Sequence, residues 1–220
     1  MEQPRPGSLP TDRLALDVQV AILRAFARLS DGRRPVGSEQ IVGALQVSPD
    51  AVFGSTGFFV DSGWLERVGQ GRYVATEALV AYHRRLQGGA SHAAVPLLAQ
   101  SARSSWYWRT LVPSLGGGRL SRYEALVILA TEANTAEEHR PRLESLLQWL
   151  EFLDLITVDG DDIVASRAAS KGPDGPGDVV IAVSADLCLT AADLAALSPE
   201  QIRALFEAVE NLASLMRRRR

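Results

Sequence analysis

The 220-residue sequence is poor in the residues that build redox, metal and membrane-spanning structures. Cys188 is the only cysteine, which excludes an internal disulfide and any cysteine-based metal site and fits a reducing cytosol. No apolar run approaches the ~20 residues of a membrane span, and the start MEQPRPGSLP lacks the apolar stretch of a signal peptide. Lys171 is the only lysine among 23 basic residues, a bias typical of GC-rich coding sequence. We therefore expect a cytoplasmic bacterial protein that does not enter a membrane.

Sequence motifs for catalysis are also missing. The histidines His83, His92 and His139 have no acidic or cysteine partner at ligand spacing, and no G-x-S-x-G, H-E-x-x-H or Gly-rich phosphate loop occurs. The acidic run at 159–162, DGDD, lacks the 12-residue loop and the terminal Glu of an EF-hand. The sequence thus predicts a protein that is not an enzyme and holds neither a cofactor nor a metal.

Charge is distributed unevenly along the chain. The net charge of −3 gives no global attraction to nucleic acid. Residues 1–90 hold ten arginines and nine acids, whereas residues 116–166 hold four arginines and ten acids. Any affinity for nucleic acid must therefore come from a local patch, and the acidic turn with Asp159, Asp161 and Asp162 should be repelled by phosphate.

Residues 13–75 show the most informative pattern of helices and strands. A helix is expected at about 13–29, where apolar residues recur at helical spacing. Ser38 can cap a short second helix, and Ser48 with Pro49 can cap a third that runs to Ser62. Two strands, 64–68 and 72–74, then flank Gly69-Gln70-Gly71, whose glycines suit a tight turn.

The end of this pattern, SGWLERVGQGRY at 62–73, resembles the strand, turn and strand segment found in many winged-helix domains. With the preceding helices the resemblance covers about 60 residues. It implies a winged-helix fold for this part of the chain. It does not choose a function, because the same fold serves DNA readers and protein–protein modules alike.

A second, looser copy follows the boundary at 115–118, LGGG. Ser121 to Glu124 forms a capping box, a Leu-rich helix starts at Pro141, and a glycine turn again separates two strands near 156–164. The fold class expected is mainly α with small β-wings, an α+β tandem of winged helices. The expected domains are a first winged helix with a Pro-rich leader at 1–90, a helical linker at 91–115, an acidic second winged helix at 116–166, and a loop, strand and amphipathic helix at 167–220.

One function that fits the resemblance is DNA binding by a transcription-regulator-like protein. The helix at 49–62 would then enter the major groove, and the residues placed to contact DNA are Arg33, Arg34, Ser48, Ser55, Arg67 and Arg72. Base edges are read by Arg, Lys, Asn and Gln, and this helix carries none of them. The sequence therefore favours weak binding to the backbone of double-stranded DNA over sequence reading.

The alternative is a protein–protein interaction adaptor or structural subunit. The small residues Gly54, Ser55 and Gly57 would allow another element to approach the third helix closely. Trp106 and Trp108, beside arginines, fit an interface hot spot, a base-stacking surface or the core of the linking helix. The apolar stripe of the last helix, with Ile202, Phe206 and Val209, would pack on its own domain, on another protein or in a homodimer. A small-molecule sensor is a third possibility.

Overall fold

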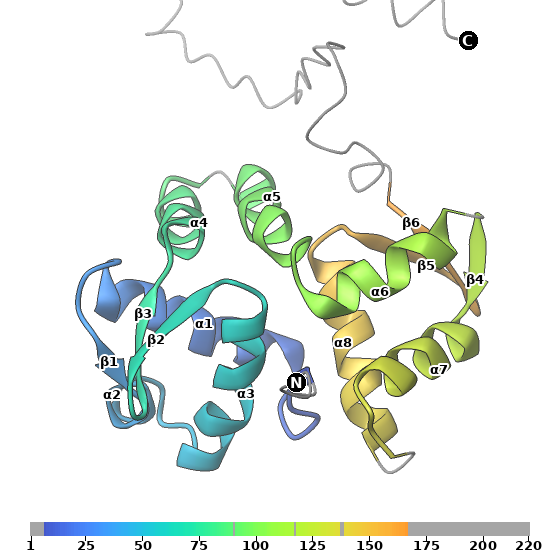
Figure 1. Ribbon diagram of the computed structural model, residues 1–220. Helices are drawn as coiled ribbons and strands as arrows, with labels where there is room; N and C mark the ends of the chain where they lie inside the picture. Colours follow the sequence, from blue (N-terminus) through green and yellow to red (C-terminus); the bar gives the residue numbers. More distant parts are fainter. Residues whose placement is uncertain (1–6, 90, 117, 137–138, 167–220) are drawn as a thin grey trace, which may run out of the picture. The chain divides into compact units, whose positions relative to one another are not determined.

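The computed structural model describes residues 7–89, 91–116, 118–136 and 139–166, all of which belong to one compact unit that spans residues 1–174. This part of the chain is mainly helical with two small antiparallel sheets, an α+β structure (Figure 1). The predicted strand at 178–189 and the predicted last helix, with Ile202, Phe206 and Val209, lie outside the described residues.

The first half forms a three-stranded sheet with three helices. Its elements are α1 (Leu16–Ser30), β1 (Val36–Gly37), α2 (Ser38–Leu45), α3 (Pro49–Asp61), β2 (Leu65–Gly69) and β3 (Arg72–Ala75). The strand order is β1-β3-β2. As predicted, Ser48 caps α3, because its Oγ accepts a hydrogen bond from the Ala51 N–H at 3.3 Å and Pro49 follows it. The two-residue strand β1 was not predicted, since so short a strand has no sequence period of its own.

Three helices connect this half to the second sheet: α4 (Glu77–Gln87), α5 (Ser91–Ala102) and α6 (Trp106–Leu115). The expected helical linker at 91–115 is thus divided in two. Helix α6 contacts α7, β4 and β6 of the following half, so it packs as the first helix of that half.

The second half repeats the element order of the first. It consists of β4 (Arg119–Ser121), α7 (Arg122–Glu132), α8 (Arg140–Phe152), β5 (Ile156–Asp159) and β6 (Asp162–Ala165). The strand order β4-β6-β5 matches β1-β3-β2. The predicted capping box is present at the start of α7, where the side chains of Ser121 and Glu124 each accept a hydrogen bond from the other residue's backbone N–H. Counting α6, both halves run helix, strand, helix, helix, strand, strand.

Backbone hydrogen bonds show which residues of the two halves correspond. The Trp64 N–H donates to the Phe59 carbonyl at 3.0 Å, and the Leu155 N–H donates to the Leu150 carbonyl at the same distance. Because each pair closes the end of its helix in the same way, Phe59 corresponds to Leu150. One residue earlier on each helix, Phe58 of α3 corresponds to Trp149 of α8.

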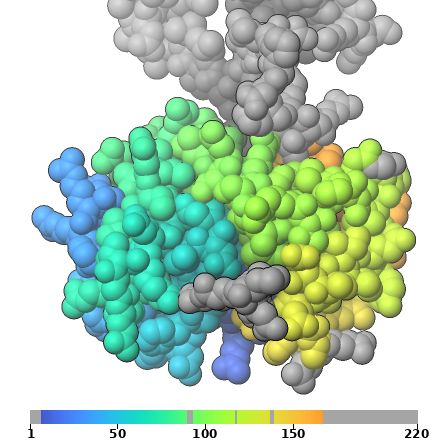
Figure 2. All heavy atoms as spheres, viewed as in Figure 1, coloured from blue at the N-terminus to red at the C-terminus, as the bar shows by residue number. Residues whose placement is uncertain are grey.

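The two halves share one hydrophobic core. Trp149 packs on Phe58, Phe59 and Trp64, with its ring centroid 5.0 Å from that of Trp64. Its Nε1 also donates a hydrogen bond to Oε1 of the buried Gln19 on α1 at 3.0 Å. Figure 2 shows the first half, in blue to teal, in direct contact with the green and yellow second half. The two sheets are separate, but the halves that carry them are packed together.

Candidate interaction surfaces

A short N-terminal segment, residues 7–11, covers part of α3, and we call it the strap. A Cβ atom added at Gly54 would lie 3.4 Å from Thr11 Cβ, and one added at Gly57 would lie 3.1 Å from Ser8 Oγ. The small residues of α3 therefore do allow close approach of another element, as the sequence suggested. That element is the chain's own N-terminal segment.

The strap is held from both sides. The Ser8 N–H donates to the carboxylate of Asp61 on α3 at 2.6 Å. From α8, the Arg142 guanidinium donates to the carbonyl oxygens of Leu9 at 2.8 Å and Pro10 at 3.1 Å. Strap and α8 together cover the face of α3 that carries Gly57 and Phe58, whereas Gly54 stays exposed.

The two serines predicted to contact DNA lie in different environments. Ser48 is exposed, and its hydroxyl caps α3. Ser55 has 0% of its surface exposed, and its hydroxyl donates to the Ala51 carbonyl at 3.0 Å. The prediction for Ser55 is corrected here: a residue one turn along the helix from Ala51 points into the core, where no phosphate can reach it.

The two predicted arginines of the β2–β3 hairpin, Arg67 and Arg72, do not share a face. Arg67 pairs with Tyr73 across the hairpin, and its guanidinium carbon lies 5.6 Å from the centre of the Tyr73 ring. Arg72 precedes Tyr73 on β3, so its side chain points to the opposite face. The two guanidinium groups therefore start from opposite faces of the hairpin.

The other two predicted arginines, Arg33 and Arg34, are exposed in the loop between α1 and β1. Arg33 lines a hollow of about 580 Å³ with Arg84 and Arg85 of α4. The structure thus groups Arg33 with arginines of α4 that the sequence pattern did not indicate. Helical spacing could have indicated them, since Arg84 and Arg85 end a helix whose other face is apolar.

The aromatic run of α6 belongs to the core. Tyr107 is fully buried, Trp108 is 5% exposed and Trp106 is half-buried. The phenol of Tyr107 lies 3.0 Å from the Ser62 hydroxyl, and burial raises the pKa of Tyr107 to about 12. For Trp108, the structure agrees with one of the interpretations that the sequence left open, the core of a linking helix. Trp106 lies against the strap instead, because a side chain at Gly7 would overlap its ring.

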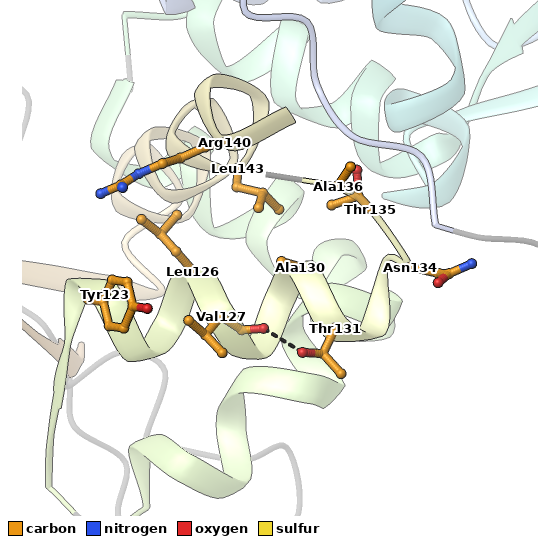
Figure 3. A pocket seen from close by; sticks show the side chains of 10 residues that line it. All are labelled: Tyr123, Leu126, Val127, Ala130, Thr131, Asn134, Thr135, Ala136, Arg140 and Leu143. Carbon is orange, nitrogen blue, oxygen red and sulfur yellow. Dashed lines mark hydrogen bonds between the residues drawn. The ribbon is translucent and has the colours of Figure 1, made fainter. Parts of the chain in front are cut away.

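A groove with an apolar floor lies between α7 and α8. It encloses about 460 Å³, with Leu126, Ala130 and Leu143 facing the space between the two helices (Figure 3). Tyr123 and Val127, one turn apart on α7, border it and are 65% and 45% exposed. A second hollow of about 400 Å³ shares Asn134 and Thr135 with the groove and extends to Phe53 of α3, which is 57% exposed.

The acidic turn of the second half carries a cation that the sequence pattern did not place there. Arg119 of β4 lies 3.2 Å from Asp159 and 3.0 Å from Asp162, because β4 and β6 pair at this end of the sheet. These carboxylates raise the pKa of Arg119, chiefly through the hydrogen bond with Asp162. Within the described residues, no group of three or more His, Cys, Asp and Glu side chains could hold a metal ion.

Comparisons with known proteins found no relative for the chain. No protein-family model matches it, and no curated protein or solved structure does so either. Among the helices that the structure describes, none is both long enough and apolar enough to cross a membrane.

Proposed function

We propose that this chain is a cytoplasmic, non-enzymatic protein-interaction module built from two winged-helix units. The repeated element order and the matching strand orders β1-β3-β2 and β4-β6-β5 support the tandem arrangement. In this interpretation α3 and α8 are the third helices of their units, and β2–β3 and β5–β6 are the wings.

One observation carries the choice of protein partners over sequence-reading DNA contact. A helix-turn-helix reader inserts its second helix into the major groove, so one face of that helix must be free. Here one face of α3 packs on Trp149 of α8 through Phe58 and Phe59, and the strap lies against the half-buried Gly57, while Gly54 stays exposed. A duplex would have to displace both before it reached this face. The large exposed side chain that remains on α3 is Phe53, which is apolar.

The groove between α7 and α8 supplies the proposed binding site. Its floor is apolar and its border includes the polar groups of Thr131, Thr135 and Arg140, a combination that suits the apolar face of an amphipathic helix. Helix α7 has 11 residues and is therefore about 16 Å long, which matches three turns of a partner helix. Tyrosine is enriched among residues that dominate binding energy, so Tyr123 is the expected anchor.

Photo-crosslinking in cells of the source organism tests this proposal. A photoreactive benzoylphenylalanine is placed at position 123 or 127, and at Gln148 as a control, an exposed position of α8 that does not line the groove. Positions 123 and 127 should capture the same protein, through a segment with apolar residues at helical spacing. Val127→Asp should abolish capture from position 123.

Three outcomes would count against this assignment. They are the absence of an adduct, equal capture from position 148, and capture of another copy of this chain alone. The last would instead support a homodimer, which is one of the alternatives that the sequence left open.

Binding of double-stranded DNA is kept as a second proposal, in a form that reads no sequence. The exposed arginines next to α1 favour it, and the occupied face of α3 restricts it to contacts with the backbone. The α7–α8 groove plays no part in it.

A further inference from the structure

Six exposed arginines gather on one side of the first half, and we call this surface the α1–α4 basic face. They come from the second half of α1, from the loop after it and from the end of α4, and they are Arg24, Arg28, Arg33, Arg34, Arg84 and Arg85. Four of the six, those on the two helices, were not among the DNA contacts predicted from the sequence.

Several contacts show that the three segments meet. Helices α1 and α4 pack on each other, and Arg84 of α4 lies 3.2 Å from Asp31, which follows α1. Burial lowers the pKa of His83 on α4, and Arg24 and Arg28, one turn apart on α1, add to this shift.

The hollow lined by Arg33 and Arg84 joins the loop to the same helix end. Packing, rather than proximity in sequence, therefore brings these arginines together.

The charge of this face stands out against the rest of the chain. The same contacts include two acids, Asp31 and Glu77. Six arginines and two acids give the face a net charge of about +4, whereas the whole chain carries −3. Arg28, Arg84 and Arg85 lie in the last turns of their helices, where a cation is favourable by itself. Arg24, Arg33 and Arg34 lie outside those last turns, so stabilisation of the helix ends does not account for them.

We propose that the α1–α4 basic face binds the phosphate backbone of duplex DNA without reading its sequence. Guanidinium groups form paired hydrogen bonds with phosphate oxygens, and a duplex presents about one charge per 1.7 Å of its axis. The major groove is wide enough for one helix. Because α1 and α4 pack together, neither can enter the groove alone, and the bases remain out of reach.

Other polyanions fit this surface less well. Proteins that bind single strands use exposed aromatic rings as stacking surfaces, and Tyr82 of α4 is buried. Helices that lie on membranes insert large apolar side chains. Among the residues that the structure describes, the large apolar side chains that are exposed lie on neither α1 nor α4.

This inference deepens the second function proposed above and is independent of the first, because none of the six arginines lines the α7–α8 groove. The test is fluorescence anisotropy of the full chain with a labelled duplex of about 20 base pairs, over a range of salt concentrations. We compare the wild type with the variant Arg24→Ala, Arg28→Ala, Arg84→Ala, Arg85→Ala. The slope of log affinity against log salt should fall by roughly 0.9 for each phosphate that is no longer neutralised, about 3 to 4 in all.

Three controls separate a binding role from a structural one. Replacing the same four residues by lysine should retain most of the affinity and the salt slope, because the charges remain. The pair Arg67→Ala, Arg72→Ala should bind as the wild type does, because neither residue is one of the six arginines of this face. Circular dichroism should show the same fold in each variant, and thermal unfolding should change only slightly, since the side chains are exposed and their helix-end and ion-pair contributions are small.

Four results would overturn the proposal. The first two are a wild type that does not bind even at about 50 mM salt and a four-alanine variant that keeps its affinity and slope. The third is competition by polyglutamate or phosphatidylglycerol vesicles as strong as that by the duplex, which would assign the face to an acidic protein or a membrane. The fourth is a tenfold preference for one of two unrelated duplexes, which would mean that bases are read.

Discussion

Phe58 and Trp149 hold corresponding positions on α3 and α8, and their ring centroids lie 5.5 Å apart. The third helices of the two halves therefore face each other, and each uses the same position to bury its neighbour. The face of α3 that carries Phe58 is therefore closed to a DNA groove, whereas Phe53 lies on the exposed face of the same helix. The pair thus links the packing of the two halves to the kind of partner that the chain can bind.

The first prediction tests this pair by a double-mutant cycle. Phe58→Ala and Trp149→Ala should each lower the free energy of unfolding by about 3 to 5 kcal/mol, because each leaves a large cavity in the shared core. The double variant should lose less than the sum, with a coupling of about 0.5 to 3 kcal/mol. Urea unfolding measures all three, and Phe53→Ala, on the exposed face of α3, is the control, with an expected change within about 0.5 kcal/mol. Strict additivity would show that the two rings do not support each other.

The second prediction concerns Gln19, the buried polar residue that joins α1 to both the strap and α8. Its Nε2 donates to the carbonyl oxygens of Thr11 and Leu14, each at 2.9 Å, and its Oε1 accepts from Trp149. Gln19→Met keeps the volume and leaves those groups unpaired, so unfolding free energy should fall by about 1 to 3 kcal/mol or more. Denaturant unfolding measures the loss, and Gln46→Met, at an exposed helix end, should change it little. Equal stability of Gln19→Met and the wild type would mean that water replaces the missing amide.

Much of the local structure could be predicted from the sequence, because short-range signals set it. Ser48 with Pro49 and Ser121 with Glu124 mark helix starts by hydrogen bonds within one turn. The glycine turn of the hairpin was found in the same way, with Gly71 at a φ of +64°. The strand β1 was missed because its pairing with Tyr73 spans 37 residues and leaves no local pattern.

The surfaces were harder to predict, because they depend on how distant elements pack. Ser55 has the chemistry of a DNA contact, but helical phase turns it into the core. The approach of Thr11 to Gly54 and the grouping of Arg24 with Arg84 both come from tertiary contacts. Composition indicated that a local basic patch was needed, but it could not say which arginines form it.

The third prediction is a loss of stability at high pH that depends on Tyr107. The pKa of this phenol is about 12 in the folded chain and near 10 when unfolded, because burial opposes the phenolate. A raised pKa contributes stability that is complete below pH 10 and is lost as pH rises to about 12, by up to about 3 kcal/mol. Urea unfolding at pH 9 and pH 11.5 should show this fall, and it should be smaller in Tyr107→Phe.

Tyr82 acts in the same direction, since burial raises its pKa as well. Tyr82→Phe is therefore the matched comparison, and Tyr107→Phe together with Tyr82→Phe should remove more of the alkaline loss than either alone. A wild-type stability that is flat between pH 9 and 11.5 would contradict the burial that raises these pKa values.

The fourth prediction concerns the acidic turn of the second half. Asp159→Asn together with Asp162→Asn removes both carboxylates that contact Arg119. Exposed ion pairs contribute little, so unfolding free energy should change by less than about 1 kcal/mol. Affinity for duplex DNA should stay the same or rise, because two charges that repel phosphate are gone. The anisotropy titration measures this, and a marked fall in affinity would show that these carboxylates touch bases.

The last prediction uses two glycines of α3 to test the strap. Alanine in a helix interior is favoured over glycine by about 0.5 to 1 kcal/mol, so an uncovered α3 should be stabilised by either Gly54→Ala or Gly57→Ala. With the strap in place the two should differ. The methyl of Ala at position 54 would lie 3.4 Å from Thr11, which is an ordinary contact. The methyl of Ala at position 57 would lie 3.1 to 3.2 Å from Ser8, so Ser8 of the strap must move by a few tenths of an ångström.

Gly54→Ala should therefore raise unfolding free energy, and Gly57→Ala should raise it less or lower it. Arg142→Ala separates strap displacement from other effects, because it removes the hydrogen bonds that α8 donates to Leu9 and Pro10. In that background the penalty at position 57 should shrink, since the strap can move away. Hydrogen exchange of the α3 amides should then quicken. Equal gains in unfolding free energy from both alanines, with Arg142 unchanged, would mean that the strap does not lie against Gly57 in solution. Trp149 alone would then close a face of α3 to DNA.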